Sequence, residues 1–595
     1  MNNNSSGGGA EAGIRGSNVP IQTHQIAQWS GSTATITLAN KWVQNCINSH
    51  ERCKPSTELA SSLPSRLLEI KFSKTRHRYC VRLCIANIQP NSKYATLSHV
   101  WGNVDFVKLL KSNFASFQKD IPISSLTRTF QDALKLALRF GFHYLWIDSL
   151  YIIQDDGDDW LKESALMGNV YGGSSLNIAA TGARNGNDGL FFKRDLNLVR
   201  TVDLMTQVED QKNCFGANDS KRDNLRLAWV CVDGSMYRRA CRESPLYQRA
   251  WTFQERFLSP RTLHFGKPQM ILRCHTLINY ETFPETRSTN FEEGDTVESQ
   301  YCTFRRAWSI IVENYSKSQL TISSDKLVAF SGVAKHFANK YKVEYLAGIW
   351  KEHLPHALVW SVDDKDGTRP LPLRRPSWSW ASRNGPIKYD RIYSFVTTPY
   401  DDRPSPWEAD VFKVLDVQVR TTTPDLYGHC LGGTMRIECV NLLNGTETSG
   451  EVYRHRSSKT VHIGEESFSI NYYFDDWRDH HTIYLLKIFS RNKLGNPKPF
   501  HEGSSNIQCR PPPFFPPIPG AHDCEEGLII APVASKKGVF TRVGIYQVPA
   551  YGGTLQGFEN LRNKGELSFE NKLSLYKGVS GVNKAGHQTY IITLV

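Results

Sequence analysis

The sequence predicts a mixed α/β protein: a sheet with parallel strands at its centre and helices on its faces, then a helical extension, then a β-rich C-terminal region. Two observations support this prediction. Between residues 94 and 180, apolar runs and amphipathic stretches follow the order strand, helix, strand, helix, strand with short connections, which is typical of a parallel sheet with right-handed crossovers. From about residue 411 the apolar residues recur with a period of two, which is typical of β-strands.

The composition excludes several classes of protein. The 595 residues suggest about three or four folding units, and 40% apolar residues supply enough area for large cores. There is no run of 18 apolar residues and no signal-peptide pattern at the start, so we expect no membrane span and no secretion. The net charge of +13 is spread along the chain, so we predict no specific nucleic-acid partner. Thirteen cysteines, an odd number without a dense framework, fit free thiols in a reducing compartment, the cytosol or the nucleus, and we expect a cytoplasmic protein.

We expect five segments. The first is a disordered tail, because its Asn, Ser, Gly and Thr residues cannot offset the entropy of ordering a core. An N-terminal helix and strands, the parallel-centred domain, a mixed helical extension and a β-rich region follow. The five expected segments are residues 1–38, 39–93, 94–256, 257–400 and 401–595.

The elements of the first half can be placed from local signals. We expect a helix from Lys41 to His50 and a helix around residues 130–138, with Ser124 or Ser125 as its N-cap and Gly141 as its stop. A further helix should span about residues 160–171, where a cluster of Asp residues complements the helix dipole. Strands are expected at residues 68–72, 79–85, 94–97, 144–148 and 175–180.

Downstream, residues 246–258 have helical spacing with Trp251 on the buried side, Ser259-Pro260 ends this helix, and a strand begins at Thr262. We expect helices at residues 304–315, 325–341 and 345–360, and strands at 414–419, 434–440, 482–489, 527–533 and 541–548. The proline-rich segment 511–519 is interpreted as a loop, with a polyproline ligand for a partner as the alternative.

Polar residues directly follow two of the predicted parallel strands. In such sheets the ligand crevice lies at the carboxyl ends of the strands, where the segments Ser98–Gly102 and Asp148–Gln154 would converge. Glu163 borders the apolar stripe of the next helix, where aromatic neighbours would raise the pKa of its carboxyl and suit it to bind a sugar hydroxyl. The sequence therefore predicts a carboxylate-rich site at this edge.

Each candidate has a structural alternative. Glu163 could instead be solvated or paired with Lys162 or a nearby arginine, and Asp148 could cap the following turn. We interpret Glu255 as a structural partner of Arg249 or Arg256. The phosphate-binding GxxxxGK[ST], nucleophile-elbow GxSxG and zinc-protease HExxH motifs are absent, which argues against an NTPase, an esterase and a metalloprotease.

Cys46, His50 and Cys53 fall at i, i+4 and i+7, so on a continuous helix they would share one face. They could begin a zinc site, but Cys80 and Cys84 lack the CxxC spacing of a second half-site. We therefore favour packing of small buried thiols and assign no metal ligands, which leaves metal binding open.

Four ordered blocks carry a resemblance to a known family. They are Tyr94-Ala-Thr-Leu-Ser98-His99-Val-Trp101-Gly102, then Leu145-Trp-Ile-Asp148-Ser-Leu-Tyr-Ile-Ile-Gln154-Asp-Asp156, then Asp159-Trp-Leu-Lys-Glu163-Ser-Ala-Leu-Met167, and Arg249-Ala-Trp-Thr-Phe-Gln-Glu-Arg256. Together they resemble the HET (heterokaryon incompatibility) domain of filamentous fungi. Two positions depart from that family: Tyr151 stands where Cys is frequent, and His99-Val100 replaces a frequent Tyr-Cys.

The resemblance implies a domain that triggers growth arrest or programmed cell death when genetically unlike fungal cells fuse. It also implies a distant relation to TIR domains, some of which cleave NAD with a helical glutamate. On that basis Glu163 and Asp148 are the expected catalytic residues, and NAD is the expected substrate rather than a cofactor. Ser98, His99, Trp101, Gly102 and Gln154 are the expected substrate-binding residues.

Three interpretations remain open at this point. The first is an incompatibility effector that cleaves NAD, and the second is a non-enzymatic HET module that oligomerises or binds a partner. The third is a paralogue without a role in fusion incompatibility. The sequence identifies neither the trigger or allelic partner nor the oligomeric state nor the function of the β-rich end.

Overall fold

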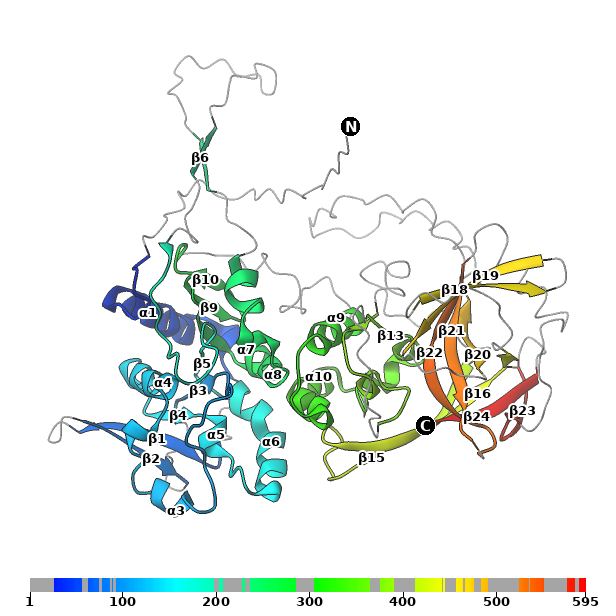
Figure 1. The fold of residues 1–595 in the computed structure, drawn as a ribbon, viewed down its shortest axis with the longest axis horizontal. Coiled ribbons are helices and arrows are strands. Elements are labelled where there is room, and N and C mark those ends of the chain that lie inside the picture. Colours follow the sequence, from blue (N-terminus) through cyan, green and yellow to red (C-terminus); the bar gives the residue numbers. More distant parts are fainter. Residues whose placement is uncertain are drawn as a thin grey trace, which may run out of the picture.

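The computed structural model has two lobes joined by helices (Figure 1). It describes residues 26–55, 63–73, 78–85, 88, 92–196, 203–206, 227–230, 236–284, 304–363, 375–389, 412–440, 442–444, 456–463, 466–475, 483–490, 524–534, 536–549, 575–583 and 588–595.

The first lobe is built on an eight-stranded sheet with the order β10-β9-β8-β5-β3-β4-β1-β2. The four central strands β4, β3, β5 and β8 are parallel, and the outer strands pair antiparallel. This confirms the predicted parallel-centred sheet with β3 and β4 as neighbours. The strands are β1 (Leu67–Ser73), β2 (Arg78–Cys84), β3 (Tyr94–Ser98), β4 (Tyr144–Trp146), β5 (Leu176–Ala179), β8 (Arg261–Phe265), β9 (Met270–Cys274) and β10 (Ile278–Tyr280).

Helices cover both faces of this sheet. On one face, α1 (Thr33–Ser49) and α4 (Arg128–Arg139) share an apolar core with Ala95 and Leu97 of β3. On the other face, Tyr94 of β3 packs with residues of α6 (Gly157–Gly172), and α6 contacts α8 (Trp251–Leu258). Because side chains alternate along a strand, Ser98 points to the α6 face.

Several boundaries differ from those expected. Helix α1 begins at Thr33 rather than Lys41 because Ser32 Oγ accepts a hydrogen bond from Thr35 N (3.2 Å), so part of the expected tail is helical. Helix α4 is capped by Thr127 instead of Ser124 or Ser125, which lie in a 3₁₀ turn. Gly141 ends it with φ of 85°, as predicted.

Strand β4 ends at Trp146, and Asp148 starts the short helix α5 (Asp148–Tyr151) instead of ending the strand. Strands β8 to β10 extend the same sheet past residue 256, so the expected domain boundary falls inside this lobe. Further short elements of the lobe include α3 (Phe114–Phe117), α7 (Pro245–Gln248) and the hairpin β6 (Asp203–Thr206) with β7 (Leu227–Val230).

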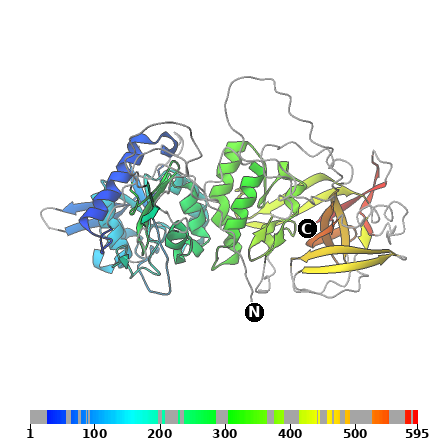
Figure 2. The ribbon, with the colours of Figure 1, turned by 90° about the horizontal axis from the view of Figure 1, so that it is seen from above.

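Helices α9 (Phe304–Ser316) and α10 (Ser331–Tyr341) lie between the two sheets in both views (Figures 1 and 2). Helix α9 confirms its prediction, whereas 3₁₀ turns replace the first part of the helix expected at residues 325–341. The helix predicted at 345–360 is wrong. The backbone turns at Ala347 (φ 46°) and Gly348 (φ 106°), and it forms a small hairpin of β11 (Tyr345–Leu346) and β12 (Ile349–Trp350).

The C-terminal region is the predicted β-rich unit, a ten-stranded sheet whose pairs are antiparallel except β22 with β24. The sheet confirms all five strands that the period-two pattern predicted in this region. The proline-rich segment 511–519 lies outside the described residues. Its strands are β15 (Phe412–Thr421), β16 (Cys430–Cys439), β17 (Leu443–Asn444), β18 (Arg456–Ile463), β19 (Glu466–Phe474), β20 (Tyr484–Ser490), β21 (Cys524–Pro532), β22 (Val539–Pro549), β23 (Gly578–Val582) and β24 (Gln588–Leu594). A two-stranded sheet of β13 (Ser361–Val362) and β14 (Ile387–Lys388) lies before them in the chain.

The lobes meet where α10 packs against α6 and α8. A Cβ atom added to Gly168 of α6 would lie 2.7 Å from Cα of Gly332 in α10, so the two backbones touch directly. Gly332 N also donates a hydrogen bond to Gln254 Oε1 of α8 (3.2 Å). The helical extension is therefore fixed to the two helices on one face of the first sheet.

Candidate functional site

Three of the predicted residues meet at the carboxyl ends of β3 and β4. Trp101 Nε1 donates a hydrogen bond to Asp148 Oδ2 (3.0 Å), and His99 Nδ1 lies 3.7 Å from Asp148 Oδ1. The same Oδ1 accepts from the backbone N–H of Ser149 (2.7 Å), so Asp148 also caps its own turn, as its structural alternative proposed. The two segments predicted to converge therefore do so.

Gly102 gives the loop after β3 its shape. Its φ of 64° lies in the left-handed region, and an added Cβ would lie 2.6 Å from the Cβ atom of Asn185. Only glycine combines this conformation with so close an approach. Gly102 therefore holds the Trp101 loop against the loop that follows β5.

Ser98 connects this edge to the carboxyl group of Glu255, for which a structural role was expected. Its hydroxyl donates to Asn177 Oδ1 of β5 (3.1 Å), and it lies close to the Glu255 carboxyl of α8. The Tyr171 hydroxyl of α6, which donates to the Leu97 carbonyl oxygen (3.4 Å), is a second polar neighbour of Glu255. Glu255 is only 3% exposed, and its Oε2 has no hydrogen-bond partner among the described residues.

Burial raises the pKa of Glu255 to about 7, and the negative charge of Asp148 acts in the same direction. The Ser98 and Tyr171 hydroxyls and the Arg249 guanidinium oppose this rise. A carboxyl group with a pKa near neutrality exchanges its proton at physiological pH. Glu255 is thus the group at this edge best suited to proton transfer.

His99 and Arg249 complete the cluster. Burial lowers the pKa of His99 to about 4, so the imidazole is neutral at pH 7, and its ring packs edge-on against Phe130 with centroids 4.9 Å apart. Arg249, between α7 and α8, donates to the His99 carbonyl oxygen. Arg249 therefore supplies positive charge beside both Glu255 and the His99 loop.

Glu163 lies on the same face of the sheet but not in this cluster. Its Oε1 lies 3.2 Å from Arg66 Nη2 and accepts a hydrogen bond from Ser65 Oγ (3.0 Å). Its Oε2 accepts from the Tyr151 hydroxyl (2.7 Å), and the side chain is fully buried. Both carboxylate oxygens accept hydrogen bonds, and the negative charge faces an arginine. Glu163 is therefore paired with a nearby arginine, which was one of its expected structural roles.

Arg66 is shared between two carboxylates, because the same Nη2 also contacts Asp159 Oδ1 (2.7 Å). Asp159 Oδ2 in turn accepts from Ile153 N (2.8 Å). Gln154 also points elsewhere, since its amide donates to the Ile152 carbonyl oxygen (2.9 Å). The structure therefore brings together Ser98, His99, Trp101 and Asp148 with Gly102 beside them, and it separates Glu163 and Gln154 from them.

Arg249 and Glu255 lie in a block predicted to be helical, and a structural pairing rather than a functional role was expected for them. The available signal was the position of this block, because a helix that connects two neighbouring parallel strands starts at their carboxyl edge. Trp251 in the same block was predicted to be buried against the sheet, but it is only half-buried. Its ring packs edge-on against Trp160 of α6, with centroids 6.2 Å apart.

A surface cavity of about 510 Å³ lies on the other face of the sheet. Residues of α1, α4 and the β1–β2 hairpin line it, among them Ile36, Leu136 and Phe72. None of the predicted site residues is among its lining residues, so it is unrelated to the cluster at the strand ends.

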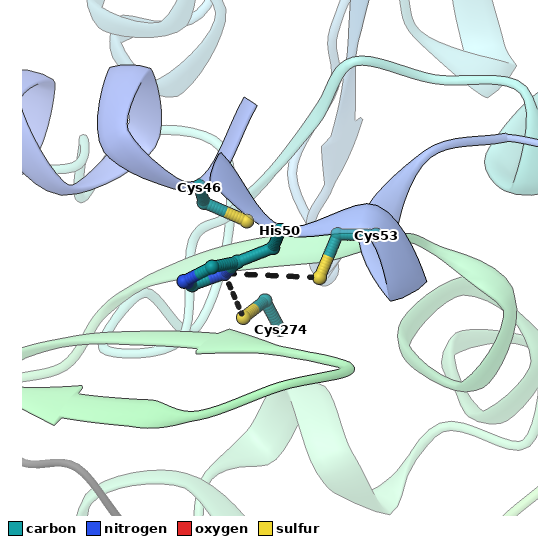
Figure 3. A group of neighbouring side chains, drawn as sticks. All are labelled: Cys46, His50, Cys53 and Cys274. Atoms are coloured by element: carbon teal, nitrogen blue, oxygen red, sulfur yellow. Dashed lines mark hydrogen bonds between the residues drawn. The ribbon is translucent and has the colours of Figure 1, made fainter. Parts of the chain in front are cut away.

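A second cluster joins the N-terminal helix to β9. Cys46, His50 and Cys53 converge with Cys274, the last residue of β9, and their ligand atoms all lie within 4.8 Å of one another (Figure 3). The helix does not continue as expected, because α1 ends at Ser49 and His50 has an extended backbone. The three predicted side chains nevertheless share one side of the chain, and the fourth comes from far downstream.

The first lobe is thus an α/β domain with a parallel-centred sheet and a polar cluster at the carboxyl ends of its strands. Residues 94–255 match the family model described as heterokaryon incompatibility protein (HET), which covers well under half of the chain. This segment is a HET domain, as the four sequence blocks indicated. Neither the curated proteins nor the solved structures gave a match. Among the described residues, the helices are too short or too polar to cross a membrane.

Proposed function

We propose that this protein is an effector of fungal heterokaryon incompatibility that arrests growth or triggers cell death from the cytoplasm. The HET match at residues 94–255 supports the link to incompatibility. The free cysteines of the described chain are in keeping with a reducing compartment.

We further propose that the effector acts by cleaving NAD, with the carboxyl edge of the TIR-like sheet as its site. In this reaction the bond between ribose C1′ and the nicotinamide nitrogen breaks, and its electron pair leaves with nicotinamide, which becomes neutral. Water then bonds to C1′ and loses a proton. A nearby carboxylate stabilises the positive charge that develops on the ribose, as in glycoside hydrolysis.

The observation that carries this proposal is Glu255. It is a buried carboxyl group whose Oε2 has no hydrogen-bond partner in the described part of the chain, with a pKa near 7, beside Ser98 at the ends of the parallel strands. It can stabilise the ribosyl cation as a carboxylate and accept the proton that water releases. Glu163, the glutamate expected from the resemblance, has both oxygens engaged and is already paired with Arg66. We therefore assign the catalytic role to Glu255 in its place.

Other residues of the cluster take supporting roles in the proposal. Asp148 lies at the edge, partly exposed, where it could bind a ribose hydroxyl, and it holds the Trp101 indole in place. Trp101 is itself partly exposed and offers an aromatic surface to the nicotinamide ring. Ser98, His99 and Gly102 shape the loop beside Glu255.

The test is nicotinamide release from NAD by the purified full-length chain. Glu255→Gln keeps the shape and removes the charge, so turnover should fall by on the order of 100-fold, the usual effect of losing one preorganised electrostatic group. Glu163→Gln is the matched control, because it makes the same change on the neighbouring helix. Its turnover per folded molecule should stay close to that of the wild type. A Glu255→Gln protein with unchanged turnover would refute the assignment.

The alternative function is a non-enzymatic module that oligomerises or binds an incompatibility partner. It is favoured by the deep burial of the cluster, since Ser98, His99 and Glu255 are each at most 3% exposed. In fungal cells that express the chain, growth arrest without NAD loss, unchanged by Glu255→Gln, would support association and reject the enzymatic proposal.

A further inference from the structure

The cluster of Cys46, His50, Cys53 and Cys274 carries an inference independent of the strand-end site. Its four side chains come from three separate places: the last turn of α1, the 3₁₀ turn that follows it, and the end of β9. Figure 3 shows them turned toward a common centre. The three cysteines are buried, and His50 is half-buried.

The distances within the cluster fit a tetrahedral metal centre. His50 Nδ1 lies 3.5 Å from Cys274 Sγ and 4.0 Å from Cys53 Sγ. Zinc bonds of about 2.3 Å to sulfur and 2.0 Å to nitrogen place neighbouring ligand atoms about 3.5–3.8 Å apart in a tetrahedron. Small movements of the side chains would bring all four atoms to these separations.

A buried arginine lies next to the cluster, and its positive charge needs a nearby negative charge to offset the cost of burial. Arg261, the first residue of β8, is 3% exposed, and its Nε donates to Cys46 Sγ (3.1 Å). Its other donors reach the carbonyl oxygens of Cys53 (2.7 Å) and Ser175 (2.6 Å). Among the described residues it contacts no carboxylate, so a buried charge would stay uncompensated if the three sulfurs were neutral thiols.

A zinc ion with three thiolates and one neutral imidazole carries one net negative charge, which matches Arg261. The surrounding donors also suit thiolates. The backbone N–H groups of Thr276 and Leu277 both donate to Cys274 Sγ (3.4 Å each). The Thr276 hydroxyl lies 3.4 Å from Cys53 Sγ. Hydrogen bonds of this kind orient metal-bound sulfur and favour its charged form.

We propose that Cys46, His50, Cys53 and Cys274 bind one structural Zn²⁺ ion. Three sulfurs and one nitrogen fill a tetrahedral site, so no position is left open for a substrate, and the ion has a structural rather than a catalytic role. It joins α1 to the end of β9. Both elements lie outside residues 94–255, so the ion connects the segments that flank the HET match on either side.

The competing explanations are packing of reduced thiols and a disulfide. Packing explains burial but not the convergence of three sulfurs on one imidazole nitrogen beside an arginine. A disulfide would use two of the sulfurs and remove the negative charge that Arg261 needs. Both explanations predict a protein without bound metal, so metal content separates them from zinc binding.

The test is the zinc content of the full-length chain, purified without chelators and measured by mass spectrometry. We expect about one zinc ion per chain, and less than about a tenth of that in Cys274→Ser. Cys84→Ser is the matched control, because it removes another buried cysteine of the same sheet, at the end of β2 and outside the cluster. It should keep the full zinc content.

Cobalt substitution keeps the proposal testable if Cys274→Ser does not fold. Co²⁺ bound to the wild-type chain should give the visible bands of a tetrahedral ion and a strong sulfur-to-cobalt charge-transfer band. His50→Cys should still bind the ion and intensify the charge-transfer band. A wild-type chain without zinc and without these cobalt bands, or with a disulfide between two of the three cysteines, would overturn the proposal.

Discussion

The Glu255→Gln substitution should change how the stability of the protein depends on pH. The pKa of Glu255 is about 7 in the folded chain and about 4.5 when the carboxyl is exposed to water. Between these values the folded state binds more protons than the unfolded state, so the free energy of unfolding decreases as pH rises from 4.5 to 7. Glutamine resembles the protonated carboxyl and does not titrate, so the variant lacks this decrease.

The magnitude follows from the difference in pKa. One pKa unit corresponds to about 1.4 kcal/mol, so the carboxyl destabilises the folded wild-type chain by about 3 kcal/mol above pH 8 and by about 1 kcal/mol at pH 5. The stability advantage of Glu255→Gln over wild type should therefore grow by about 2 kcal/mol from pH 5 to pH 8. Asp148, Arg249, Tyr171 and His99 face this group or adjoin it, and they are present in both proteins.

The assay is urea unfolding of both full-length chains at pH 5, 6, 7 and 8, compared pairwise at each pH. The comparison is necessary because other buried groups also titrate. His99, whose pKa is lowered to about 4, makes stability fall as pH drops from 6.5 to 4, which opposes the Glu255 effect in the wild-type curve. A difference between the two proteins that is constant over this range would refute the raised pKa and with it the proton-transfer role of Glu255.

Three further predictions concern folding. Glu163→Gln should destabilise the chain by about 2–3 kcal/mol, because the glutamine amide cannot accept the hydrogen bonds from both Ser65 and Tyr151 and does not neutralise the charge of Arg66. An unchanged urea midpoint would contradict this. Trp251→Ala should cost about 2 kcal/mol, less than a fully buried tryptophan, because Trp251 is half-buried against Trp160; a loss above about 4 kcal/mol would show deeper burial. Gly102→Ala should lower the melting temperature, since alanine at φ of 64° is strained by about 1 kcal/mol or more; a melting temperature equal to wild type would show that the loop adapts.

Much of the first sheet could be predicted because its signals are local. The strand before Ser98, the amphipathic helix that Gly141 ends, and the buried strand at residue 144 each follow from a short window of sequence. The strand ends then follow from topology, which is why Asp148 and Trp101 were correctly expected to converge.

The parts that could not be predicted depend on distant contacts. Cys274 is 224 positions from His50, and no local pattern indicates that β9 ends beside α1. The partner of Glu163 is Arg66, which precedes an antiparallel strand on the far side of β4. The helix expected at residues 345–360 had suitable periodicity, but the turn at Ala347 and Gly348 overrides it.

The paired glycines where α6 crosses α10 have a mechanical consequence. At most contacts between helices, side chains lie between the two backbones and can change rotamer when one helix shifts. At Gly168 and Gly332 backbone meets backbone, and only the Leu258 and Gln254 side chains of α8 lie beside the contact. No side chain of α6 or α10 can therefore rearrange there, and movement of α10 toward α6, which carries Tyr171, is opposed by backbone contact. The second lobe is in this way in direct contact with the two helices whose side chains surround the carboxyl group at the strand ends.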